Sequence, residues 1–293
     1  MQEIVVAPGE GVKKLENFLK KKYPIGYVRK LFRKNGIRLN GRRAKTDNTI
    51  HAGDRIQLYI PFEATAAKPT PSSSLNAIET IYEDESLLVI DKPAGIAVHE
   101  GKSVSRRESL ADFIEKTYRG NKFRPKLAHR LDKDTSGVLV LAKSESALSE
   151  LESQFETGNA DKEYLCLVVG RVANNEGKID SPLPGRGGDL VRAVTRYRVV
   201  KRFAETTLVR VSLETGRLHQ IRLHFANLGY PVVMDDQHGD FVFNKRFRKA
   251  YGLKRQFLHA AKLAIGFGGT RCSWTAPLPK DLAHTLKLIE VNE

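Results

Sequence analysis

Residues 127–144 read LAHRLDKDTSGVLVLAKS, and this stretch decides the fold because a polar loop leads directly into an apolar run. Residues 137–142, GVLVLA, are short, continuous and apolar, which is typical of a buried strand, and the turn-forming Thr135-Ser136 pair precedes them. Four charged side chains crowd the loop ahead of this strand: Arg130, Asp132, Lys133 and Asp134. Charged side chains at the start of a buried strand indicate a role other than structural support.

Other strand-like runs surround this stretch in the sequence, at residues 87–90, 164–169 and 207–213. Loops and only a few helical patterns separate them. A regular alternation of strands and helices would favour a parallel sheet, whereas this order predicts an α+β domain on a mixed, mostly antiparallel sheet.

A change of composition divides the chain. Residues 63–74, EATAAKPTPSSS, combine Ala, Thr, Pro and Ser with almost no apolar bulk, as a semi-flexible tether does. We therefore expect an N-terminal domain over residues 1–62, a flexible linker over 63–75 and a larger domain over 76–293.

The N-terminal region reads as a small α+β module. Residues 27–34, YVRKLFRK, place three apolar residues at helical spacing, and residues 37–43 and 53–60 alternate like strands, with an Asn40-Gly41 turn in the first. This pattern resembles the S4 RNA-binding domain, in which a basic helix and the following strand form one charged face. The resemblance implies contacts with phosphate groups by four residues, Arg29, Lys30, Arg33 and Lys34. A solvated basic helix without a ligand is the alternative.

The charge balance favours a polyanionic partner. The chain has 49 Lys and Arg against 34 Asp and Glu, a net charge of +15, and residues 1–68 alone hold 15 basic and 6 acidic residues, a net +9. Such asymmetry indicates an electrostatic footprint on nucleic acid. A membrane surface is the rival partner, but no strongly amphipathic helix with a wide aromatic face accompanies the charge.

Several classes of protein fit the sequence poorly. No apolar stretch approaches the roughly 18 residues of a membrane span, and the N-terminus lacks the layout of a signal peptide, so a cytoplasmic location is expected. Cys166 and Cys272 are the two cysteines, which makes a disulfide framework or a zinc cluster improbable. We expect no metal and no cofactor.

A second informative stretch is ETGRLHQIRLHFANLG at residues 214–229, which predicts a turn, a helix and a closing glycine. On a helical wheel, four apolar residues share one face: Leu218, Ile221, Phe225 and Leu228. Arg222 falls at the edge of that face, and a part-buried guanidinium needs a carboxylate partner. Asp132 is the best candidate, and a purely structural Arg–Asp pair remains the alternative. His219 and His224 point about 140° apart on a helix, so they cannot share one metal ion.

Three ordered motifs carry a resemblance to the RluA family of pseudouridine synthases: HRLDKDTSG at 129–137, DKEY at 161–164 and LETGRLHQIRLH at 213–224. The segment YEDESLLVIDKPAGIAVH at 82–99 and the closing FLHAAKL and APLP also fit. With the S4-like module, the chain most resembles the RluC and RluD subgroup, which acts on large-subunit ribosomal RNA. Leu218 stands where the family often has Thr, and His238 where it often has Tyr, which puts local RNA contacts in doubt.

The resemblance implies the chemistry and the residues that carry it. The enzyme would break the bond from ribose C1′ to uracil N1 and form a bond from C1′ to C5, without a cofactor and as a monomer. Asp132 would be the catalytic aspartate, Arg222 its ion-pair partner, and Tyr164 the aromatic residue that stacks on the target uracil. Arg130 would enter the RNA as the base leaves its stack, and His129 and Arg217 would also contact the substrate.

Two other functions remain open on the residues. A non-enzymatic RNA-binding or ribosome-assembly factor could keep the fold, although the set Asp132, Tyr164 and Arg222 argues against it. A glycosidase would need a second carboxylate beside Asp132, and the sequence identifies none. The sequence names neither the uridine nor whether the RNA is ribosomal or transfer RNA.

Overall fold

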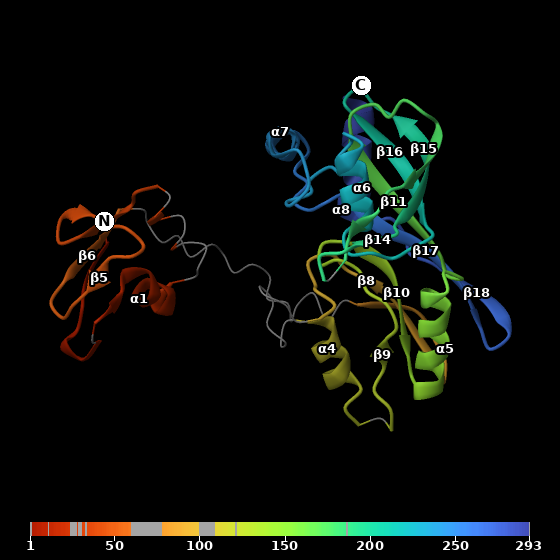
Figure 1. Cartoon of the computed structure of the whole chain (residues 1–293), viewed down its shortest axis with the longest axis horizontal. Coiled ribbons are helices and arrows are strands. Elements are labelled where there is room, and N and C mark those ends of the chain that lie inside the picture. The colour runs from red at the N-terminus through yellow and green to blue at the C-terminus, as the bar shows by residue number, and fades with distance from the viewer. Residues whose placement is uncertain are drawn as a thin grey trace. The chain divides into compact units, whose positions relative to one another are not determined.

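The structure is a computed structural model that describes residues 2–10, 12–23, 28, 31–32, 34–59, 78–99, 109–120, 122–185 and 187–292. The chain forms two compact units, Met1–Lys68 and Pro69–Glu293, which are coloured along the chain in Figure 1. The predicted linker at 63–75 lies outside the described residues. The predicted domain limits at 62 and 76 stay a prediction.

The N-terminal unit has a four-stranded antiparallel sheet in the order β1-β6-β3-β4 and a separate pair, β2 and β5. The strands are β1 (Gln2–Val5), β2 (Lys13–Lys14), β3 (Ile37–Leu39), β4 (Arg42–Arg43), β5 (Thr49–Ile50) and β6 (Arg55–Leu58), with a 3-10 turn at Pro8–Glu10. Helix α1 (Leu15–Lys22) buries Leu15, Phe18 and Leu19 in the core of this unit. The Asn40-Gly41 turn joins β3 to β4, with φ angles of 49° and 79° that suit these two residues.

The predicted basic helix falls only partly within the described residues. Val28, Leu31 and Phe32 are helical, and Val28 and Leu31 are fully buried, as the apolar spacing predicts. Lys34 is exposed. Three of the four predicted phosphate contacts, Arg29, Lys30 and Arg33, lie outside the described residues.

The C-terminal unit is built on one sheet whose main path runs β12-β15-β16-β11-β17-β10-β8-β7, with β18 paired to β17 and β9 to β10. The strands are β7 (Glu79–Glu83), β8 (Leu87–Lys92), β9 (Lys126–Leu127), β10 (Ser136–Ala142), β11 (Asp161–Val169), β12 (Glu176–Asp180), β15 (Val194–Arg202), β16 (Thr206–Leu213), β17 (Leu258–Phe267) and β18 (Thr270–Thr275). Among the strands of the described residues, β10 and β17 are the one parallel pair. The prediction of a mixed, mostly antiparallel α+β domain is confirmed.

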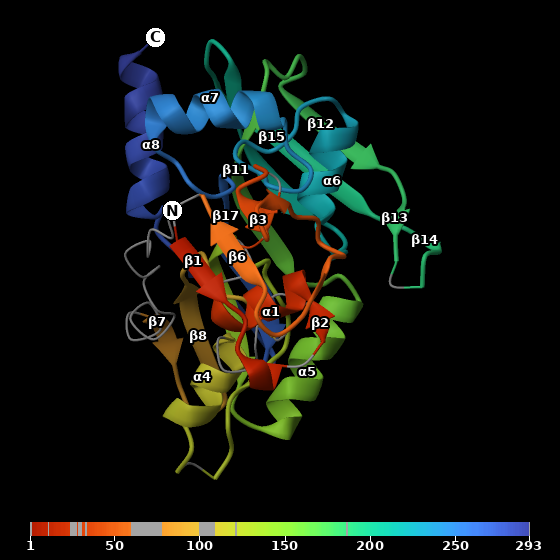
Figure 2. The ribbon, with the colours of Figure 1, turned by 90° about the vertical axis from the view of Figure 1, so that its left-hand side faces the viewer.

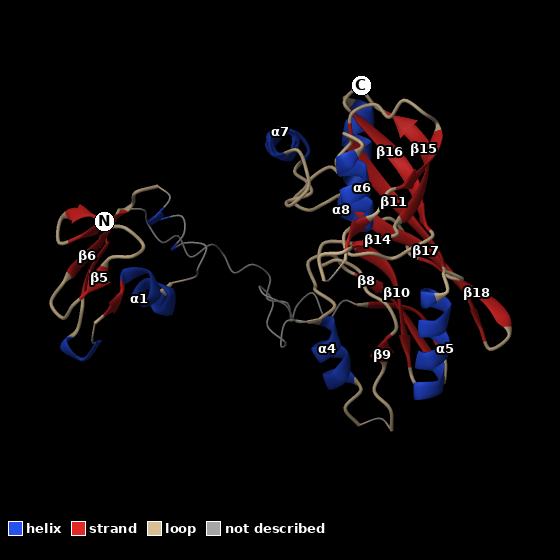
Figure 3. Ribbon diagram, viewed as in Figure 1, coloured by secondary structure: helices blue, strands red, loops and turns tan. Residues whose placement is uncertain are grey.

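Helices cover both faces of this sheet (Figure 3). They are α4 (Leu110–Thr117), α5 (Glu145–Glu156), α6 (Gln220–Asn227), α7 (Phe241–Tyr251) and α8 (Lys280–Val291). Helices α4 and α6 pack on one face, and α5 packs on the other. Helices α7 and α8 share a third cluster with Phe203 and Phe257. A small hairpin, β13 (Leu183–Pro184) and β14 (Leu190–Val191), stands apart.

Strand β10 lies at the centre of the unit, and all seven of its residues are buried. Gly137 explains how β10 begins: its φ is 117°, and a Cβ there would lie only 2.1 Å from the carbonyl oxygen of Ala260 in β17. Only glycine allows the two backbones to approach so closely. The charged loop around Asp132 is therefore fixed at the point where β10 meets β17.

None of the helices in the described parts of the chain is long and apolar enough to cross a membrane.

Candidate active site

Asp132 lies in the loop between β9 and β10, in a turn closed by a hydrogen bond from the Thr135 N–H to the Asp132 carbonyl oxygen, 3.1 Å. Its side chain is 19% exposed, so solvent or a ligand can reach it. Arg222 in α6 donates from Nη1 to Asp132 Oδ2 over 3.1 Å. The predicted pair is therefore present, across 90 residues of sequence.

Arg222 also has a second carboxylate partner, Asp235, which the sequence did not reveal. The guanidinium, 4% exposed, donates from Nε to Asp235 Oδ2 over 2.6 Å and from Nη2 to Asp235 Oδ1 over 2.8 Å. Two parallel hydrogen bonds between a guanidinium and a carboxylate hold both groups firmly. Arg222 thus uses the edge formed by Nε and Nη2 for Asp235 and its remaining nitrogen, Nη1, for Asp132.

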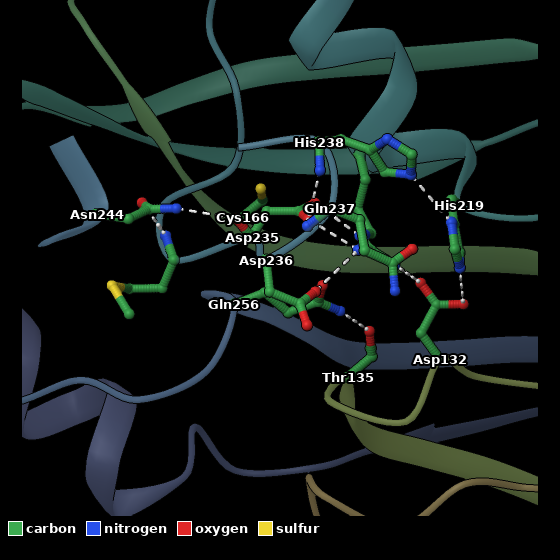
Figure 4. A network of polar contacts seen from close by, with 12 residues as sticks. Asp132, Thr135, Cys166, His219, Asp235, Asp236, Gln237, His238, Asn244 and Gln256 are labelled. Carbon is green, nitrogen blue, oxygen red and sulfur yellow. Dashed lines mark hydrogen bonds and ion pairs between the residues drawn. The ribbon is translucent and has the colours of Figure 1, made fainter. Parts of the chain in front are cut away.

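Asp235 is fully buried, and the polypeptide surrounds it with donors (Figure 4). Its Oδ1 accepts the backbone N–H groups of Gln237 and His238 at 2.9 and 3.0 Å. Burial alone would raise the pKa of Asp235, but the bonds from Arg222 and these two N–H groups hold that pKa below its ordinary value. Asp235 is therefore ionised and fixes the orientation of Arg222.

Asn244 ties this loop to helix α7. Its Nδ2 donates to the Asp235 carbonyl oxygen over 2.8 Å, and its Oδ1 accepts from the Met234 N–H over 2.8 Å. Met234 has φ 64°, a left-handed conformation that side chains rarely adopt, and this clamp holds it there. A polar chain thus runs from Asp132 through Arg222 and Asp235 to α7.

His219 is a member of the site that the sequence did not reveal. It stands at the N-cap of α6 with φ 53°, and its Nε2 lies 3.9 Å from Asp132 Oδ1. On its other side, Nδ1 lies 3.1 Å from Nε2 of His238. Burial lowers the pKa of His219. The negative charges of Asp132 and Asp235 oppose this shift, and the charges of Arg222 and His238 add to it, so that the pKa stays below its ordinary value. His219 therefore lies between Asp132 and His238 (Figure 4).

Tyr164 is the third residue of the predicted catalytic set, and it lies in β11 with only 8% of its surface exposed. The pairing of β11 with β17 shifts register between Glu163 and Tyr164, and such an irregularity re-aims a side chain. Burial, and next the charge of Asp132, raise the pKa of Tyr164. Its phenol therefore keeps its proton close to the carboxylate.

Lys92 is a second residue that the sequence did not single out, although it lies in the quoted segment 82–99. It is fully buried, and its Nζ donates to three carbonyl oxygens, those of Pro93, Ile96 and Lys133, at 2.8, 2.9 and 3.1 Å. Burial lowers the pKa of Lys92 to about 7, with Asp134 opposing the shift. Because Lys133 follows Asp132, Lys92 anchors the loop that carries Asp132.

The other predicted substrate contacts lie in different settings. Arg130 is exposed, two residues from Asp132. Arg217 is exposed and donates from Nε to the Arg192 carbonyl oxygen over 3.0 Å. His129 stacks on Phe155 at 4.5 Å, and its Nε2 accepts the Val140 N–H over 3.1 Å, so the structure does not bring it to Asp132.

The predicted apolar face of α6 needs a correction. Ile221 and Phe225 are buried as expected, but Leu218 is 52% exposed and Leu228 is also exposed. Helix α6 begins only at Gln220, so Leu218 precedes it and the helical wheel does not apply there. His224, in contrast, is fully buried and bonds to Thr195 Oγ1.

The arrangement places the partly exposed carboxylate of Asp132 beside a guanidinium that Asp235 fixes, near the buried phenol of Tyr164. Asp236, next to the fixing carboxylate, is exposed, and its Oδ1 lies 3.7 Å from Arg222 Nη2. Within the described parts of the chain, no group of His, Cys, Asp or Glu side chains could hold a metal ion. At this site Asp132 can act as a nucleophile or as a base on a ligand that contains a planar ring.

Comparison with known proteins identifies relatives over almost the whole chain. Residues 86–227 match the model of the RNA pseudouridylate synthase family. The chain is 34% identical to the ribosomal large subunit pseudouridine synthase C of Salmonella typhi, over 98% of this chain and 96% of that protein. It is 35% identical to the protein of the same name from Escherichia coli K12, over 91% of this chain and 89% of that protein.

A solved structure supports the fold. Human RNA pseudouridylate synthase domain containing 4 superposes with a TM-score of 0.64 at 24% identity, over 75% of this chain and 97% of that chain.

Proposed function

Because the chain belongs to the RluA family of pseudouridine synthases, we propose that it converts uridine to pseudouridine in large-subunit ribosomal RNA. The resemblance read from the three motifs is confirmed at the level of the family. The observation that carries the proposal is the half-buried carboxylate of Asp132, held 3.1 Å from Arg222 and next to the buried ring of Tyr164.

The reaction rearranges one nucleotide without oxidation or reduction. The C1′–N1 bond breaks, the uracil turns, and C1′ bonds to C5. The hydrogen on C5 leaves to solvent as a proton, and N1 gains a proton, so the atoms balance. Two first steps are open to Asp132, attack on C1′ or removal of a neighbouring proton, and both use its ionised carboxylate.

Arg222 places a fixed positive charge beside Asp132. Its guanidinium cannot release its proton in a protein, and its Nη1 donates to Asp132 Oδ2 over 3.1 Å. Burial lowers the pKa of Arg222, but the hydrogen bonds and charges of Asp235, and then of Asp132, outweigh burial and raise that pKa above its ordinary value. In our proposal, Asp235 positions Arg222, and Arg222 positions Asp132.

The target base must leave its stack before it reaches this site. We propose that Tyr164 packs against the detached uracil, because an aromatic ring offers a flat apolar surface to a base. Arg130, exposed two residues before Asp132, would fill the space that the base leaves. The protein would act as a monomer without a cofactor in the cytoplasm, where ribosomal RNA resides.

Tritium release tests the reaction directly. The purified full chain is incubated with an unmodified transcript of large-subunit ribosomal RNA that carries tritium at C5 of uridine. We expect release of tritium to water as C5 bonds to C1′. Stable binding without release, from the transcript and from ribosomal subunits alike, would favour the non-enzymatic RNA-binding factor.

The anchoring role of Lys92 leads to a prediction. Lys92→Met removes a donor from three carbonyl oxygens: that of Lys133 keeps the Gly95 N–H, whereas those of Pro93 and Ile96 lose the Lys92 bond. Each buried group left unsatisfied costs about 1–3 kcal/mol. We expect a melting temperature lower by at least about 4 °C, since about 1 kcal/mol shifts a unit of this size by 2–4 °C. Tritium release should fall about tenfold through displacement of Asp132, about 1.4 kcal/mol on the barrier.

The matched control is Lys133→Met, which removes an exposed lysine of the same loop. It should melt like the wild type. Equal melting temperatures for Lys92→Met and Lys133→Met would show that Lys92 does not anchor the loop.

A further prediction concerns the N-terminal unit, whose basic helix we propose to contact phosphates. Replacement of Arg29, Lys30, Arg33 and Lys34 by Ala should weaken binding to long structured RNA and make log Kd less dependent on log salt. The modified uridine should stay the same, because phosphate contacts carry no sequence information. Deletion of residues 1–68 should act alike and leave a folded C-terminal unit.

Filter binding over a series of salt concentrations, with mapping of the product, checks this expectation. Undiminished affinity and salt dependence would identify the basic helix as a solvated face. Modification of a different uridine would show that the N-terminal unit selects the site.

A further inference from the structure

Helix α7 and the four residues that follow it have a composition unlike the rest of their unit. Residues 241–255 read FVFNKRFRKAYGLKR and hold six basic residues and no acidic one. Residues 69–293 as a whole hold 34 Lys and Arg against 28 Asp and Glu, a net charge of +6. These fifteen residues therefore account for the entire positive excess of the C-terminal unit.

The basic residues lie on the outer side of α7. Phe243, Asn244 and Phe247 are buried, and they fix the inner face against the cluster that contains Phe257 and Leu282. At about 100° per residue, Lys245 and Lys249 lie opposite that inner face, one turn apart. Both are exposed, as is Arg248 beside them.

In the part of the chain that the structure describes, four of these six charges have no acidic neighbour: Lys245, Arg248 and Lys249 in α7, and Lys254 after it. Arg246 pairs with Glu205 at 2.8 Å, and Arg255 pairs with Asp281 at 2.7 Å. Among the described residues, no carboxylate lies within ion-pair distance of Lys245, Arg248 or Lys249. Cations in the last turn stabilise a helix through its dipole, which accounts for Arg248 and Lys249 but not for Lys245 in the middle. The cluster of unneutralised charge favours an anionic partner.

Apolar side chains stand exposed at the start of the same helix. Phe241 is 61% exposed and Val242 is more so, directly after the N-cap Asp240. An exposed aromatic ring next to a row of cations is the combination that binds single-stranded nucleic acid, since the ring stacks on a base and the cations hold the backbone. A duplex keeps its bases stacked on one another and would leave the aromatic ring without such a partner.

Helix α7 is also joined to the loop that carries Asp235. Asn244 holds the Asp235 backbone, and Asp235 holds Arg222, which reaches Asp132. Figure 1 shows α7 standing clear of the sheet on the side where α6 lies, and Figure 2 shows it in front on that same side. A strand of RNA whose target base enters at Asp132 can therefore continue onto α7.

We propose that α7 is a second RNA-binding surface, on which Lys245, Arg248 and Lys249 hold the phosphates of nucleotides that flank the target uridine. Phe241 stacks on a flanking base that is unpaired. This inference rests on the proposed function, because it assumes an RNA substrate at Asp132. It places part of the electrostatic footprint next to the chemistry instead of in the N-terminal unit alone.

The test compares two pairs of lysines in the full chain. The variant Lys245→Ala with Lys249→Ala removes two charges from α7, and alanine preserves the helix. The control Lys280→Ala with Lys287→Ala removes two exposed lysines without ion pairs from one side of α8. Binding to the unmodified large-subunit transcript is measured by filter binding at several salt concentrations.

We expect the α7 variant to bind about tenfold more weakly near physiological salt and the slope of log Kd against log salt to fall by about 1.5, for two contacts at 0.7–0.9 each. The rate of tritium release at saturating RNA should stay within about twofold of the wild type. The α8 control should match the wild type in both. Circular dichroism melts establish that each variant is folded, and Lys245→Gln with Lys249→Gln replaces the alanine variant if it is not.

Affinity and slope equal to those of the control would overturn the proposal for α7. Tritium release by the wild type in the same assay separates this result from a failure of the proposed function, in which the wild type itself would release none. Phe241→Ser provides the second arm: a lower kcat/KM with an unchanged salt slope supports stacking, and an unchanged kcat/KM removes Phe241 from the surface.

Discussion

Asp132→Asn is expected to abolish pseudouridine formation and to leave RNA affinity almost unchanged. The amide keeps the shape of the side chain and its place beside Arg222, but it has no charge for attack on C1′ or for removal of a proton. We expect a loss of at least a thousandfold, about 4 kcal/mol on the barrier. Single-turnover tritium release measures the rate, and filter binding measures the affinity.

Asp134→Asn is the matched control, because it makes the same chemical change in the same loop without a contact to Arg222. It should retain most of the activity. A rate for Asp132→Asn within tenfold of the wild type would remove Asp132 from the role that we propose for it.

Arg222→Met is expected to damage both stability and catalysis. It leaves Asp235 buried and unpaired and frees Asp132 from its only guanidinium contact among the described residues. Breaking a buried ion pair by removal of one partner costs about 3–5 kcal/mol. Thermal and denaturant melts should show a loss of that size, with activity reduced even at temperatures where the variant is folded.

A double-mutant cycle tests which carboxylate supports Arg222. The coupling energy of Arg222→Met with Asp235→Asn should exceed that with Asp132→Asn, because Asp235 makes two bonds in a fully buried setting. Arg246→Met supplies the comparison, since its pair with Glu205 is 65% and 61% exposed and should contribute about 0–1 kcal/mol. Strictly additive losses for Arg222 and Asp235 would show that the two do not interact.

Much of the fold and of the site could be predicted from local patterns. The apolar run at 137–142 and the strand-like runs at 87–90, 164–169 and 207–213 all lie in strands of the same sheet. A buried arginine that needs a carboxylate led correctly to a contact between Arg222 and Asp132. These inferences succeed because the apolar spacing of a strand and the need of a buried charge for a counter-charge each depend on only a few residues.

The partner that the sequence did not reveal is Asp235. In DDQHGD at 235–240, nothing distinguishes the first aspartate from the next, yet Asp235 is fully buried and Asp236 is exposed. The distinction depends on the backbone around Met234 and on the clamp from Asn244, which are tertiary features. The place of His219 at the site was not predicted for a similar reason. Its backbone is left-handed, so its side chain does not follow the spacing of a regular helix and lies near Asp132.

The positive charge of the C-terminal unit is local. Residues 1–68 have a net charge of +9, and the +6 of residues 69–293 equals the six basic residues at 241–255, four of which lie in α7. Counting within single elements, and not only within domains, would have indicated α7. Its connection to Asp235 through Asn244 still required the structure.

The most direct test of the central claim is a map of pseudouridines in large-subunit ribosomal RNA from cells that lack this gene. We predict that one or a few positions revert to uridine, that the wild-type chain restores them, and that Asp132→Asn does not, although it is produced at the same level. A map that is identical with and without the gene would contradict the account.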